Sequence, residues 1–347
     1  MPLESRETAP SDLNPALRAL EDVARAEGWT FTPLDPYSRQ LVRVEKDLAC
    51  FFAGIGRVQN FPLNSAVSAS IARDKAFTYE VVAAAGIDVP PYGHFFLNPA
   101  QAPLRGRGRE REDAFPFARA LGYPVFVKPI DGSRGALADI AYDAHDLDAL
   151  LTAIARLHHA ALVQPVLSGE DRRIFILDGT AMFTYRRLRS AVSGDGETPL
   201  GPLLAHYNAA AVGIGISAIP ETSPFLREAL AARGLTLDSI LAPGETFTFA
   251  ARGNVSAGGA IADYSEEMPK EWADWAARVT DALALRVAAV DFFAPAPDAP
   301  AASLQLIEVN SNPNLSGIIA LGHANRARDI WRRVGTTFFA EQARRDP

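Results

Sequence analysis

Two carboxylates and one amide near the C-terminal end of the sequence could hold a metal ion. Glu308 and Asn310 lie in the apolar segment LIEVNSNPN (306–314), and Asp291 lies in VAAVDFF (287–293). If both segments are strands, residues i and i+2 project from the same face, and an antiparallel neighbour brings Asp291 beside the other two. Three oxygen ligands on one rigid face suit Mg²⁺. A salt bridge from a lysine or arginine to Glu308 explains this carboxylate equally well, because an unpaired buried carboxylate is costly.

A lysine followed by glycines suggests a phosphate site. In FVKPIDGSRG (126–135), Lys128 ends an apolar run and precedes Gly132 and Gly135. Such a loop can close backbone N–H groups over phosphate oxygens. A plain β-turn explains the same residues equally well.

The segment RGNVSAGG (252–259) could serve a reacting carboxyl group. Arg252 offers a planar guanidinium and Asn254 an amide, and the two glycines that follow permit close approach of the backbone to a ligand. Donors aimed at oxygen are what acyl transfer requires. The alternative is a β-turn stabilised by Asn254, with Arg252 in solvent.

The middle of the sequence is rich in arginine, which suggests an anionic partner such as an amino-acid carboxylate. Each arginine taken singly could instead only solubilise an exposed strand face. The residues concerned are Arg172, Arg173, Arg186, Arg187 and Arg189.

The elements that must position these residues follow from apolar spacing and turn signals. Helices are predicted over 13–29, 64–86, 146–157, 270–285 and 324–345, and strands over 123–132, 160–169, 171–189 with a turn at 178–179, and 287–295. Helices and strands alternate without a fixed period, which predicts an α/β or α+β fold without internal repeats.

Composition narrows the class of function. The chain has 347 residues, enough for two or three packed units, and 48% of them are hydrophobic. A net charge of −7 argues against nucleic acid or an anionic membrane as a partner. One cysteine, Cys50, excludes an internal disulfide, and the N-terminal residues show no signal peptide. We therefore expect a cytoplasmic protein that acts on small molecules.

Six segments occur in the order that is found in ATP-grasp ligases, over roughly residues 60 to 320. The sequence most resembles the ATP-grasp modules of cyanophycin synthetase and bifunctional glutathione synthetase, and more distantly ribosomal-protein glutamate ligases and D-alanine:D-alanine ligase. Several ordered segments are a stronger signal than any one motif. The segments are IARDKAFTYEVVAAAGIDVP, YPVFVKPIDGSRG, LVQPVLSGEDRRIF, ARGNVSAGG, VAAVDFF and LIEVNSNPN.

This resemblance implies a binding site for ATP. Lys75 and Lys128 resemble the lysines that contact its phosphates, residues 164–167 resemble the hinge whose backbone faces adenine, and Asp171 would lie near the ribose. The cofactor-binding residues implied are Lys75, Lys128, Gly132, Ser133, Gly135, Gln164, Pro165, Val166, Leu167 and Asp171.

The resemblance also implies a reaction centre. Its catalytic residues would be Arg252, Asn254, Arg173 and Arg187. Its substrate-binding residues would be Ser256, Gly258, Gly259 and Asn312. Its metal ligands would be Asp291, Glu308 and Asn310, with Mn²⁺ as a substitute for Mg²⁺.

Three positions depart from the family pattern. Gln164 stands where relatives usually carry glutamate, which keeps backbone recognition of adenine but removes a charge from its edge. Ala289 stands where D-alanine:D-alanine ligases carry an arginine, so that oxyanion contact is missing. The loop GSRGALADI (132–140) lacks the usual extended glycine pattern, so its closure could differ.

The function implied is ATP-dependent joining of a carboxylate, from an amino acid or peptide, to an amine through an acyl phosphate. Two lysines, several arginines and Mg²⁺ suit phosphoryl transfer, which needs positioning and charge neutralisation. The fold implied is ATP-grasp, with ATP between two α+β subdomains. We expect an N-terminal α/β region over 1–90, a lid over 91–166, a C-terminal subdomain with the metal site over 167–347, and a homodimer.

Other functions on the same nucleotide site are a small-molecule kinase, a carboxylase and a non-catalytic ATP-binding protein. The complete metal set of Asp291, Glu308 and Asn310 argues against the non-catalytic alternative. A serine hydrolase is disfavoured because the sequence contains no G-x-S-x-G motif.

Overall fold

The two ends of the chain fold into one compact unit and its middle folds into another. The computed structural model describes residues 13–35, 39–54, 58, 61–104, 106–132, 136–188, 191–213, 218–248 and 260–344. The first unit combines Met1–Ser65 with Asn312–Pro347, and the second is Ala66–Ser311. The contacts thus divide the chain differently from the three predicted segments, because the C-terminal helix packs with N-terminal residues.

The first unit consists of helices and a three-stranded antiparallel sheet. The sheet order is β1-β2-β3. The elements are α1 (Pro15–Glu27), β1 (Thr30–Pro33), β2 (Leu41–Lys46), β3 (Ala49–Gly54), α9 (Ser316–Ala320) and α10 (Ala324–Ala343). The helices predicted over 13–29 and 324–345 are confirmed as α1 and α10.

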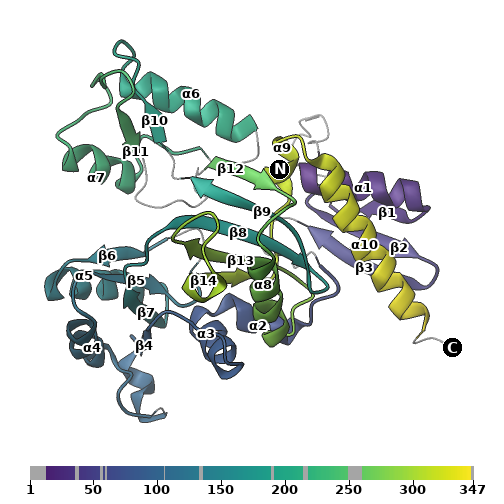
Figure 1. The fold of residues 1–347 in the computed structure, drawn as a ribbon, viewed down its shortest axis with the longest axis horizontal. Coiled ribbons are helices and arrows are strands. Elements are labelled where there is room, and N and C mark those ends of the chain that lie inside the picture. The colour runs from purple at the N-terminus through teal and green to yellow at the C-terminus, as the bar shows by residue number, and fades with distance from the viewer. Residues whose placement is uncertain are drawn as a thin grey trace, which may run out of the picture. The chain divides into compact units, whose positions relative to one another are not determined.

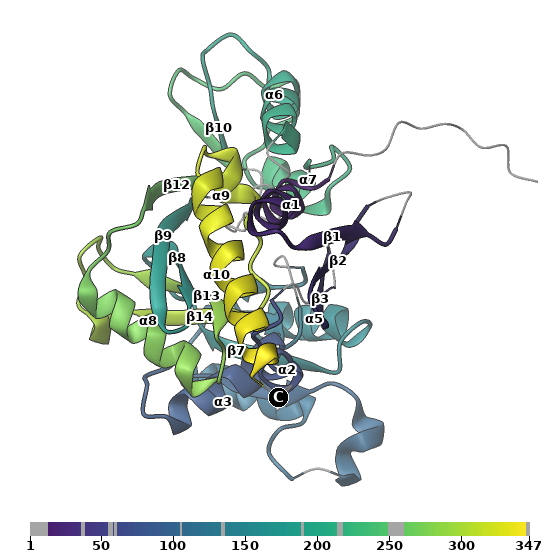
Figure 2. The same ribbon diagram turned by 90° about the vertical axis from the view of Figure 1, so that its right-hand side faces the viewer.

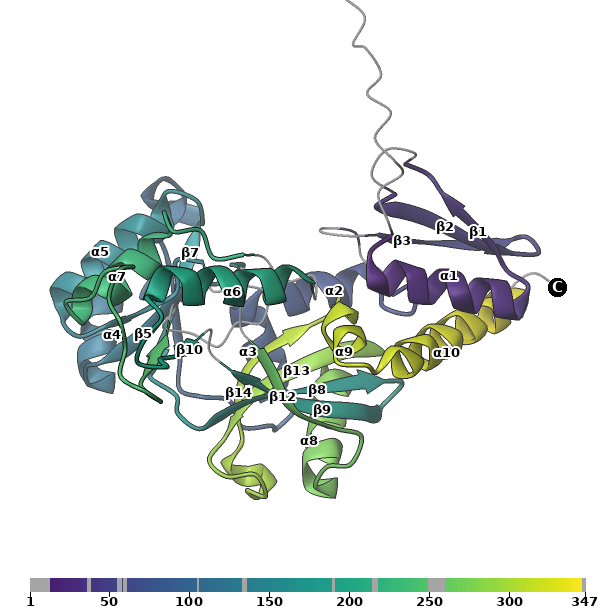
Figure 3. The ribbon, with the colours of Figure 1, turned by 90° about the horizontal axis from the view of Figure 1, so that it is seen from above.

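Helix α10 packs against the N-terminal elements (Figures 2 and 3), and aromatic side chains contribute to this contact. The indole N–H of Trp331 donates to the carbonyl oxygen of Ala16 at 3.0 Å. The rings of Trp29 and Phe339 meet edge to face, 5.1 Å apart. A Cβ atom at Gly335 would lie 2.3 Å from the Trp29 ring, so only glycine fits at that point of α10.

The second unit contains a five-stranded antiparallel sheet that carries most of the charged residues of interest (Figure 1). Its order is β12-β9-β8-β13-β14. The strands are β8 (Glu170–Leu177), β9 (Thr180–Leu188), β12 (Ala260–Ser265), β13 (Val287–Ala294) and β14 (Gln305–Asn310). The predicted strands over 171–189 and 287–295 are confirmed, and the turn between β8 and β9 lies at Asp178 and Gly179, which have φ of 47° and 70°.

Three helices pack with this sheet in one apolar core, to which Trp272 of α8 belongs. They are α2 (Ala66–Arg73), α3 (Lys75–Ala84) and α8 (Lys270–Ala282). The single helix predicted over 64–86 is wrong, because it breaks at Asp74. The Asp74 backbone is extended, with φ −94° and ψ 114°, and its side chain accepts from the N–H groups of Ala76 and Phe77. Asp74 therefore caps a second helix that begins at Lys75.

A four-stranded antiparallel sheet has its own core within the second unit. Its order is β4-β7-β5-β6. The elements are β4 (Gly93–Phe96), α4 (Ala114–Leu121), β5 (Val125–Pro129), β6 (Asp139–Ala141), α5 (Ala144–Ala155) and β7 (Ala160–Pro165). Leu147, Leu151 and Ile154 of α5 are fully buried against Val125 and Val127 of β5. Helix α5 and strands β5 and β7 confirm the predicted elements.

A further hairpin-like pair with two helices was not predicted from the sequence. The elements are β10 (Ala191–Ser193), α6 (Leu200–Gly213), α7 (Pro224–Ala232) and β11 (Thr246–Thr248). Leu200, Leu226 and Phe247 meet in a small core of their own. The short helical turns of the second unit are η1 (Pro99–Leu104), η2 (Arg111–Asp113) and η4 (Ala301–Ser303).

The sheets of the two units are antiparallel throughout their paired strands, which confirms the predicted mixed fold in its α+β form. None of the described helices is both long and apolar enough to cross a bilayer.

Candidate functional site

A cleft of about 530 Å³ brings Lys75 and Lys128 together with Glu308 and Asp171, whereas Asp291 and Asn310 are not among the residues that line it. Strands β5, β7, β8, β9 and β14 supply its walls, so both large sheets of the second unit contribute. The charged part of the lining comprises the cations Lys75, Lys128, Arg186 and Arg187 and the carboxylates of Asp139, Glu170, Asp171 and Glu308. The rest includes apolar side chains: Phe126, Ile140, Val166, Leu167 and Phe293. A ligand with an anionic part and a flat apolar part matches this lining.

Lys75 reaches the cleft from the first residue of α3. Its Nζ atom donates to the carbonyl oxygen of Gly132 at 2.6 Å and lies 3.4 Å from Glu308 Oε2. Its own backbone N–H donates to the carbonyl oxygen of Ile130 at 2.9 Å. The break in the helix at Asp74 is therefore what directs Lys75 into the site. Lys75 is therefore the cationic partner of Glu308, as one of the two interpretations of the sequence predicted.

Lys128 is the second cation, and it lies deeper, with a relative exposure of 4%. Its Nζ atom donates to the carbonyl oxygen of Ile307 at 3.3 Å and lies 5.6 Å from the centroid of the Tyr79 ring. Burial, aided by the positive charge of Lys75, lowers the pKa of Lys128 to about 7. Lys128 is thus poised to gain a proton when an anion enters the cleft.

A bulge in β14 creates the acceptor that Lys128 uses. The register between β13 and β14 places Glu308 opposite Asp291 and skips Ile307. A bulged residue is unpaired in the ladder, so the Ile307 carbonyl is available to side chains. It accepts from Lys128 and also from the Tyr79 hydroxyl at 3.0 Å. No local sequence signal marks this bulge.

Asp291 is fully buried and accepts hydrogen bonds from two arginines. Arg173 Nε lies 2.5 Å from Oδ1 and Arg173 Nη2 lies 2.6 Å from Oδ2. Arg187 Nη1 lies 2.8 Å from Oδ2. Charge-assisted forks of this kind are the strongest hydrogen bonds in proteins. Asp291 therefore neutralises two buried cations, a role that the sequence did not reveal.

Asp171 connects this cluster to the cleft. Its Oδ1 atom lies 2.8 Å from Arg187 Nε, and Asp171 lines the cleft whereas Arg187 also reaches Asp291. Burial raises the pKa of Asp171 to about 6, although the neighbouring Arg187 guanidinium acts in the opposite direction.

The predicted metal ligands do lie together. Asn310 Nδ2 is 3.1 Å from Asp291 Oδ2 and 3.3 Å from Glu308 Oε1, as the i, i+2 spacing and the antiparallel pairing required. The charges of Lys75 and three further cations hold the pKa of Glu308 well below its usual range, against the effect of burial, so it is ionised at neutral pH.

The donor set fits a hard divalent ion such as Mg²⁺. Glu308 is a partly exposed carboxylate, and Asp291 Oδ1 accepts only from Arg173 among the described residues, which leaves it one lone pair. Asn310 directs its NH₂ group at both carboxylates, so its amide oxygen would bind an ion only after a half-turn of the amide. The described residues contain no cluster of three or more His, Cys, Asp or Glu residues with metal-site geometry, so an ion here needs the amide and other oxygens, such as those of phosphate or water.

Comparisons with known proteins identify relatives in sequence and in fold. No protein-family model matches the chain. Cyanophycin synthetase from Geminocystis herdmanii is 27% identical over 256 residues, which are 70% of this chain and 28% of that protein. The glutathione biosynthesis bifunctional protein from Mannheimia succiniciproducens is 28% identical over 262 residues, 72% of this chain and 33% of that protein. The chain thus spans about a third or less of these relatives.

A solved structure decides the fold. The crystal structure of a bifunctional glutathione synthetase from Pasteurella multocida superposes with a TM-score of 0.55 and 24% identity, covering 87% of this chain and 41% of that one. The chain has the ATP-grasp fold. The resemblance and the fold predicted from the sequence are therefore confirmed.

The hinge predicted for the ATP-grasp fold lies at the end of β7. Gln164, Val166 and Leu167 line the cleft, and Gln164 itself is only 2% exposed. Pro165 is the last residue of the strand. Gln164 pairs in register with Phe126 of β5, so the amide lies next to an aromatic wall of the ATP-grasp cleft.

Several predicted residues are not brought into the site by the described structure. Asn312 belongs to the first unit, where its Nδ2 atom donates to the carbonyl oxygen of Val58 at 2.6 Å. The predicted residues Ser133, Gly135, Arg252, Asn254, Ser256, Gly258 and Gly259 lie outside the described residues, and so does Arg189.

The other arginines of the ATP-grasp sheet have carboxylate partners within the protein. Arg172 lies 2.6 Å from Glu170 Oε2 and over the ring of Trp272, and Arg186 lies 2.8 Å from Asp263 Oδ2. Internal pairing therefore accounts for Arg172 without an external anion, whereas Arg186 also lines the cleft. The chief residue that the sequence interpretation missed is Tyr79. A single tyrosine within an apolar helix gave no sign that its hydroxyl group reaches the cleft strands.

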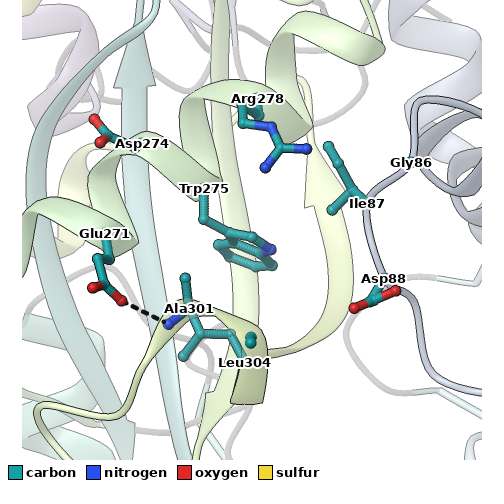
Figure 4. Close-up of a pocket in the computed structure, with 10 residues that line it drawn as sticks. Gly86, Ile87, Asp88, Glu271, Asp274, Trp275, Arg278, Ala301 and Leu304 are labelled. Atoms are coloured by element: carbon teal, nitrogen blue, oxygen red, sulfur yellow. Dashed lines mark hydrogen bonds between the residues drawn. The ribbon is translucent and has the colours of Figure 1, made fainter.

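A second hollow, of about 370 Å³, lies apart from the ATP-grasp cleft (Figure 4). Helix α8 and the segment after α3 line it, with Trp275 and Arg278 on one side and Asp88 on the other. Glu271 accepts from the backbone N–H of Ala301 at 3.2 Å. One arginine among three acidic side chains suits a triphosphate less well than the lining of the cleft does.

Proposed function

We propose that the chain is an ATP-dependent ligase that joins a carboxylate to an amine through an acyl phosphate. The relatives that the chain matches in sequence are named as a synthetase and a biosynthetic protein. The chain shares its fold with the bifunctional glutathione synthetase from Pasteurella multocida. Because the chain spans only part of those proteins, their activity supports the proposal without establishing it. The substrates we propose are amino acids or short peptides.

The observation that carries the proposal is the meeting of Lys75 and Lys128 with Glu308 in the cleft. Nζ of Lys75 lies 3.4 Å from Glu308, and Lys128 is bound to the carbonyl oxygen of the preceding residue, Ile307. Two lysines beside one ionised carboxylate, in a cleft that also has arginines and apolar walls, match a nucleotide phosphate chain with its counter-ion and base.

In the proposed reaction the substrate carboxylate oxygen attacks the γ-phosphorus of ATP. The bond from that phosphorus to the bridging oxygen breaks, and ADP leaves. The amine nitrogen then attacks the acyl carbon, an amide bond forms, and phosphate departs with loss of the amine proton to solvent. Lys75 and Lys128 orient the phosphates and offset their charge, which is most of what phosphoryl transfer needs.

Bound Mg²⁺, or Mn²⁺ in its place, would be held by Glu308, Asn310 and Asp291 and would neutralise phosphate charge. The arginines Arg173 and Arg187 keep the Asp291 carboxylate in position whether or not the ion is bound, because their bonds to it are internal to the sheet. Asp171 lines the cleft, where its carboxylate could accept a hydrogen bond from a ribose hydroxyl.

Acyl transfer itself is assigned to residues outside the described part of the chain. Arg252 and Asn254, with Ser256, Gly258 and Gly259, would face the reacting carboxyl group. A homodimer, a cytoplasmic location and a lid formed by residues 91–166 also stay predictions.

A screen of ADP release tests this function. Amino acids and short peptides are offered in pairs with ATP and Mg²⁺, and products are identified by mass. A ligase yields one ADP per amide product, whose mass is the sum of the two substrates less one water. Glu308→Gln should lower product formation by about 10²-fold or more, and Glu271→Gln in the second hollow is the matched control that should not lower it.

Other outcomes identify the alternatives. A phosphorylated product that forms without any amine would indicate a kinase. Tight ATP binding with no ADP release for any pair would support the non-catalytic ATP-binding protein.

A further inference from the structure

The Tyr79 hydroxyl is buried at the junction of α3, β7 and β14. Tyr79 has no exposed surface, and three oxygen atoms surround its hydroxyl group. The carbonyl oxygens of Leu306 and Ile307 lie at 2.9 Å and 3.0 Å, and Gln164 Oε1 lies at 3.4 Å. Burial raises the pKa of Tyr79 above its usual value, so the hydroxyl keeps its proton at neutral pH.

One proton cannot serve three acceptors. A phenol has a single O–H donor, and a main-chain carbonyl can only accept. The two carbonyl oxygens are the nearer neighbours, so the Tyr79 proton belongs to β14. The hydroxyl oxygen of Tyr79 is then left to accept a hydrogen bond from Gln164.

The Gln164 side chain can satisfy that acceptor by a half-turn of its amide. The amide oxygen and nitrogen are nearly identical in shape, and the hydrogen-bond network decides which of them lies where. With Nε2 directed at Tyr79, the amide N–H group faces the hydroxyl oxygen, and donor and acceptor are complementary. The amide oxygen Oε1 is then directed the other way, and Gln164 lines the cleft beside Phe126.

We propose that Tyr79 is a positioning residue that holds the Gln164 amide with its oxygen toward the nucleotide base, and so selects a 6-aminopurine over a 6-oxopurine. This inference rests on the proposed function and adds the origin of base specificity. Adenine offers N–H donors at position 6, whereas hypoxanthine and guanine offer an oxygen acceptor there. An amide oxygen facing position 6 accepts from the amino group of adenine and repels the oxygen of hypoxanthine or guanine. A glutamine presents its oxygen there reliably only if a neighbouring residue fixes the orientation of the amide.

Tyr79→Phe isolates the hydroxyl from the rest of the side chain. The ring, which lies 5.6 Å from Lys128 Nζ, is retained, so the phosphate end of the cleft keeps its aromatic contact. Tyr92→Phe is the matched control, because the Tyr92 ring meets Tyr79 edge to face at 5.0 Å and its hydroxyl is bonded to Glu80.

Calorimetric titration of the full chain with ATP and with inosine triphosphate, both with Mg²⁺, measures base selection without turnover. The two nucleotides differ only around position 6 of the base. We expect wild type to bind ATP at least about tenfold more tightly, the effect of one mismatched hydrogen bond. Tyr79→Phe should reduce the ratio of the two affinities about tenfold, and Tyr92→Phe should leave it within threefold.

Gln164→Glu tests the amide orientation independently of any change at Tyr79. A carboxylate can only accept, so this variant should keep the wild-type ratio within about threefold. In its background Tyr79→Phe should no longer change the ratio, because no amide is left to orient. Melting temperatures are recorded for all variants, and a purely structural role for Tyr79 would lower them without altering the ratio.

Three results would overturn the inference while the proposed function stands. These are an unchanged ratio in Tyr79→Phe, a wild type that binds both nucleotides equally, and a more than tenfold rise of the ratio in Gln164→Glu, which would show that glutamine presents its NH₂ group. A wild type that binds neither nucleotide would instead contradict the proposed function itself.

Discussion

Arg173 and Asp291 form a two-pronged ion pair between neighbouring strands, with N–O distances of 2.5 Å and 2.6 Å. They are register partners on β8 and β13, and the Asp291 side chain is fully buried. Arg187 adds a third bond to the same carboxylate at 2.8 Å. Asp291 is thus a structural counter-ion of two arginines as well as a candidate metal ligand.

Asp291→Asn should therefore destabilise the fold as well as affect any metal. It leaves the buried Arg187 and the partly buried Arg173 with much weaker compensation, and removing one partner of a buried ion pair costs about 3 kcal/mol or more. Urea unfolding at pH 7 measures the loss. The control Asp274→Asn makes the same chemical change in an exposed pair with Lys270 and should cost under about 1 kcal/mol. Equal losses in the two variants would contradict the counter-ion role.

Glu308→Gln should act on turnover more than on stability. The Glu308 side chain is 27% exposed, so its neutral isostere keeps the shape and leaves Lys75 in contact with the Gly132 carbonyl oxygen and with solvent. We expect ADP formation to fall by about 10²-fold or more, as is typical for the loss of a preorganised charge. A rate within about threefold of wild type, under 1 kcal/mol in the barrier, would remove Glu308 from the reaction.

ATP binding above pH 7 should take up a proton at Lys128. In the free protein burial and Lys75 lower its pKa to about 7, so the amine is largely neutral at pH 8. A bound phosphate favours the ammonium form and raises that pKa again, so affinity should fall as pH rises from about 7 to 9. Calorimetry in buffers of different ionisation enthalpy measures the uptake, which Lys128→Met should remove.

The Lys128 amine should also make the stability of the nucleotide-free protein depend on pH. Between pH 7 and the ordinary lysine value the unfolded chain binds the Lys128 proton and the folded chain does not, so stability gains a contribution that increases with pH. Denaturant unfolding at pH 7 and pH 9 should show this increase in wild type and a smaller one in Lys128→Met. A larger increase in the variant would mean that another group titrates.

Arg252→Ala should lower turnover by about 10²-fold or more with nearly constant ATP affinity, if Arg252 contacts only the reacting carboxyl group. Steady-state rates and nucleotide titration separate the two quantities. Under the alternative of a β-turn with Arg252 in solvent, neither should change much. Weaker ATP binding with unchanged turnover at saturation would move Arg252 to the nucleotide site.

Residues 91–166 should move as a lid when nucleotide binds. The four-stranded sheet in this range has an apolar core distinct from that of the five-stranded sheet, and prolines restrain the chain at Pro90, Pro91 and Pro165. Hydrogen exchange with and without a non-hydrolysable ATP analogue should show increased protection in peptides covering residues 130 to 138. Unchanged protection there would argue against closure over the phosphates.

The sequence by itself determined the strands of the site and the side chains that they present. Alternation along a strand is a local property, so the spacing of Glu308 and Asn310 was enough to predict that they meet, and the apolar run before Lys128 was enough to place it at a strand end. The order of the motifs, which is also a one-dimensional property, was enough to predict the ATP-grasp fold.

Only the tertiary structure decided which partners these side chains have. Arg173 and Asp291 are 118 residues apart in sequence, and Tyr79 and Ile307 are 228 apart, so no local pattern connects them. The bulge at Ile307 and the helix break at Asp74 arise where a strand and a helix must fit elements from elsewhere in the chain. Burial and hydrogen bonding between distant segments give Lys128 its low pKa and Gln164 its proposed orientation, because both effects depend on what surrounds a side chain in space and not on its neighbours in sequence.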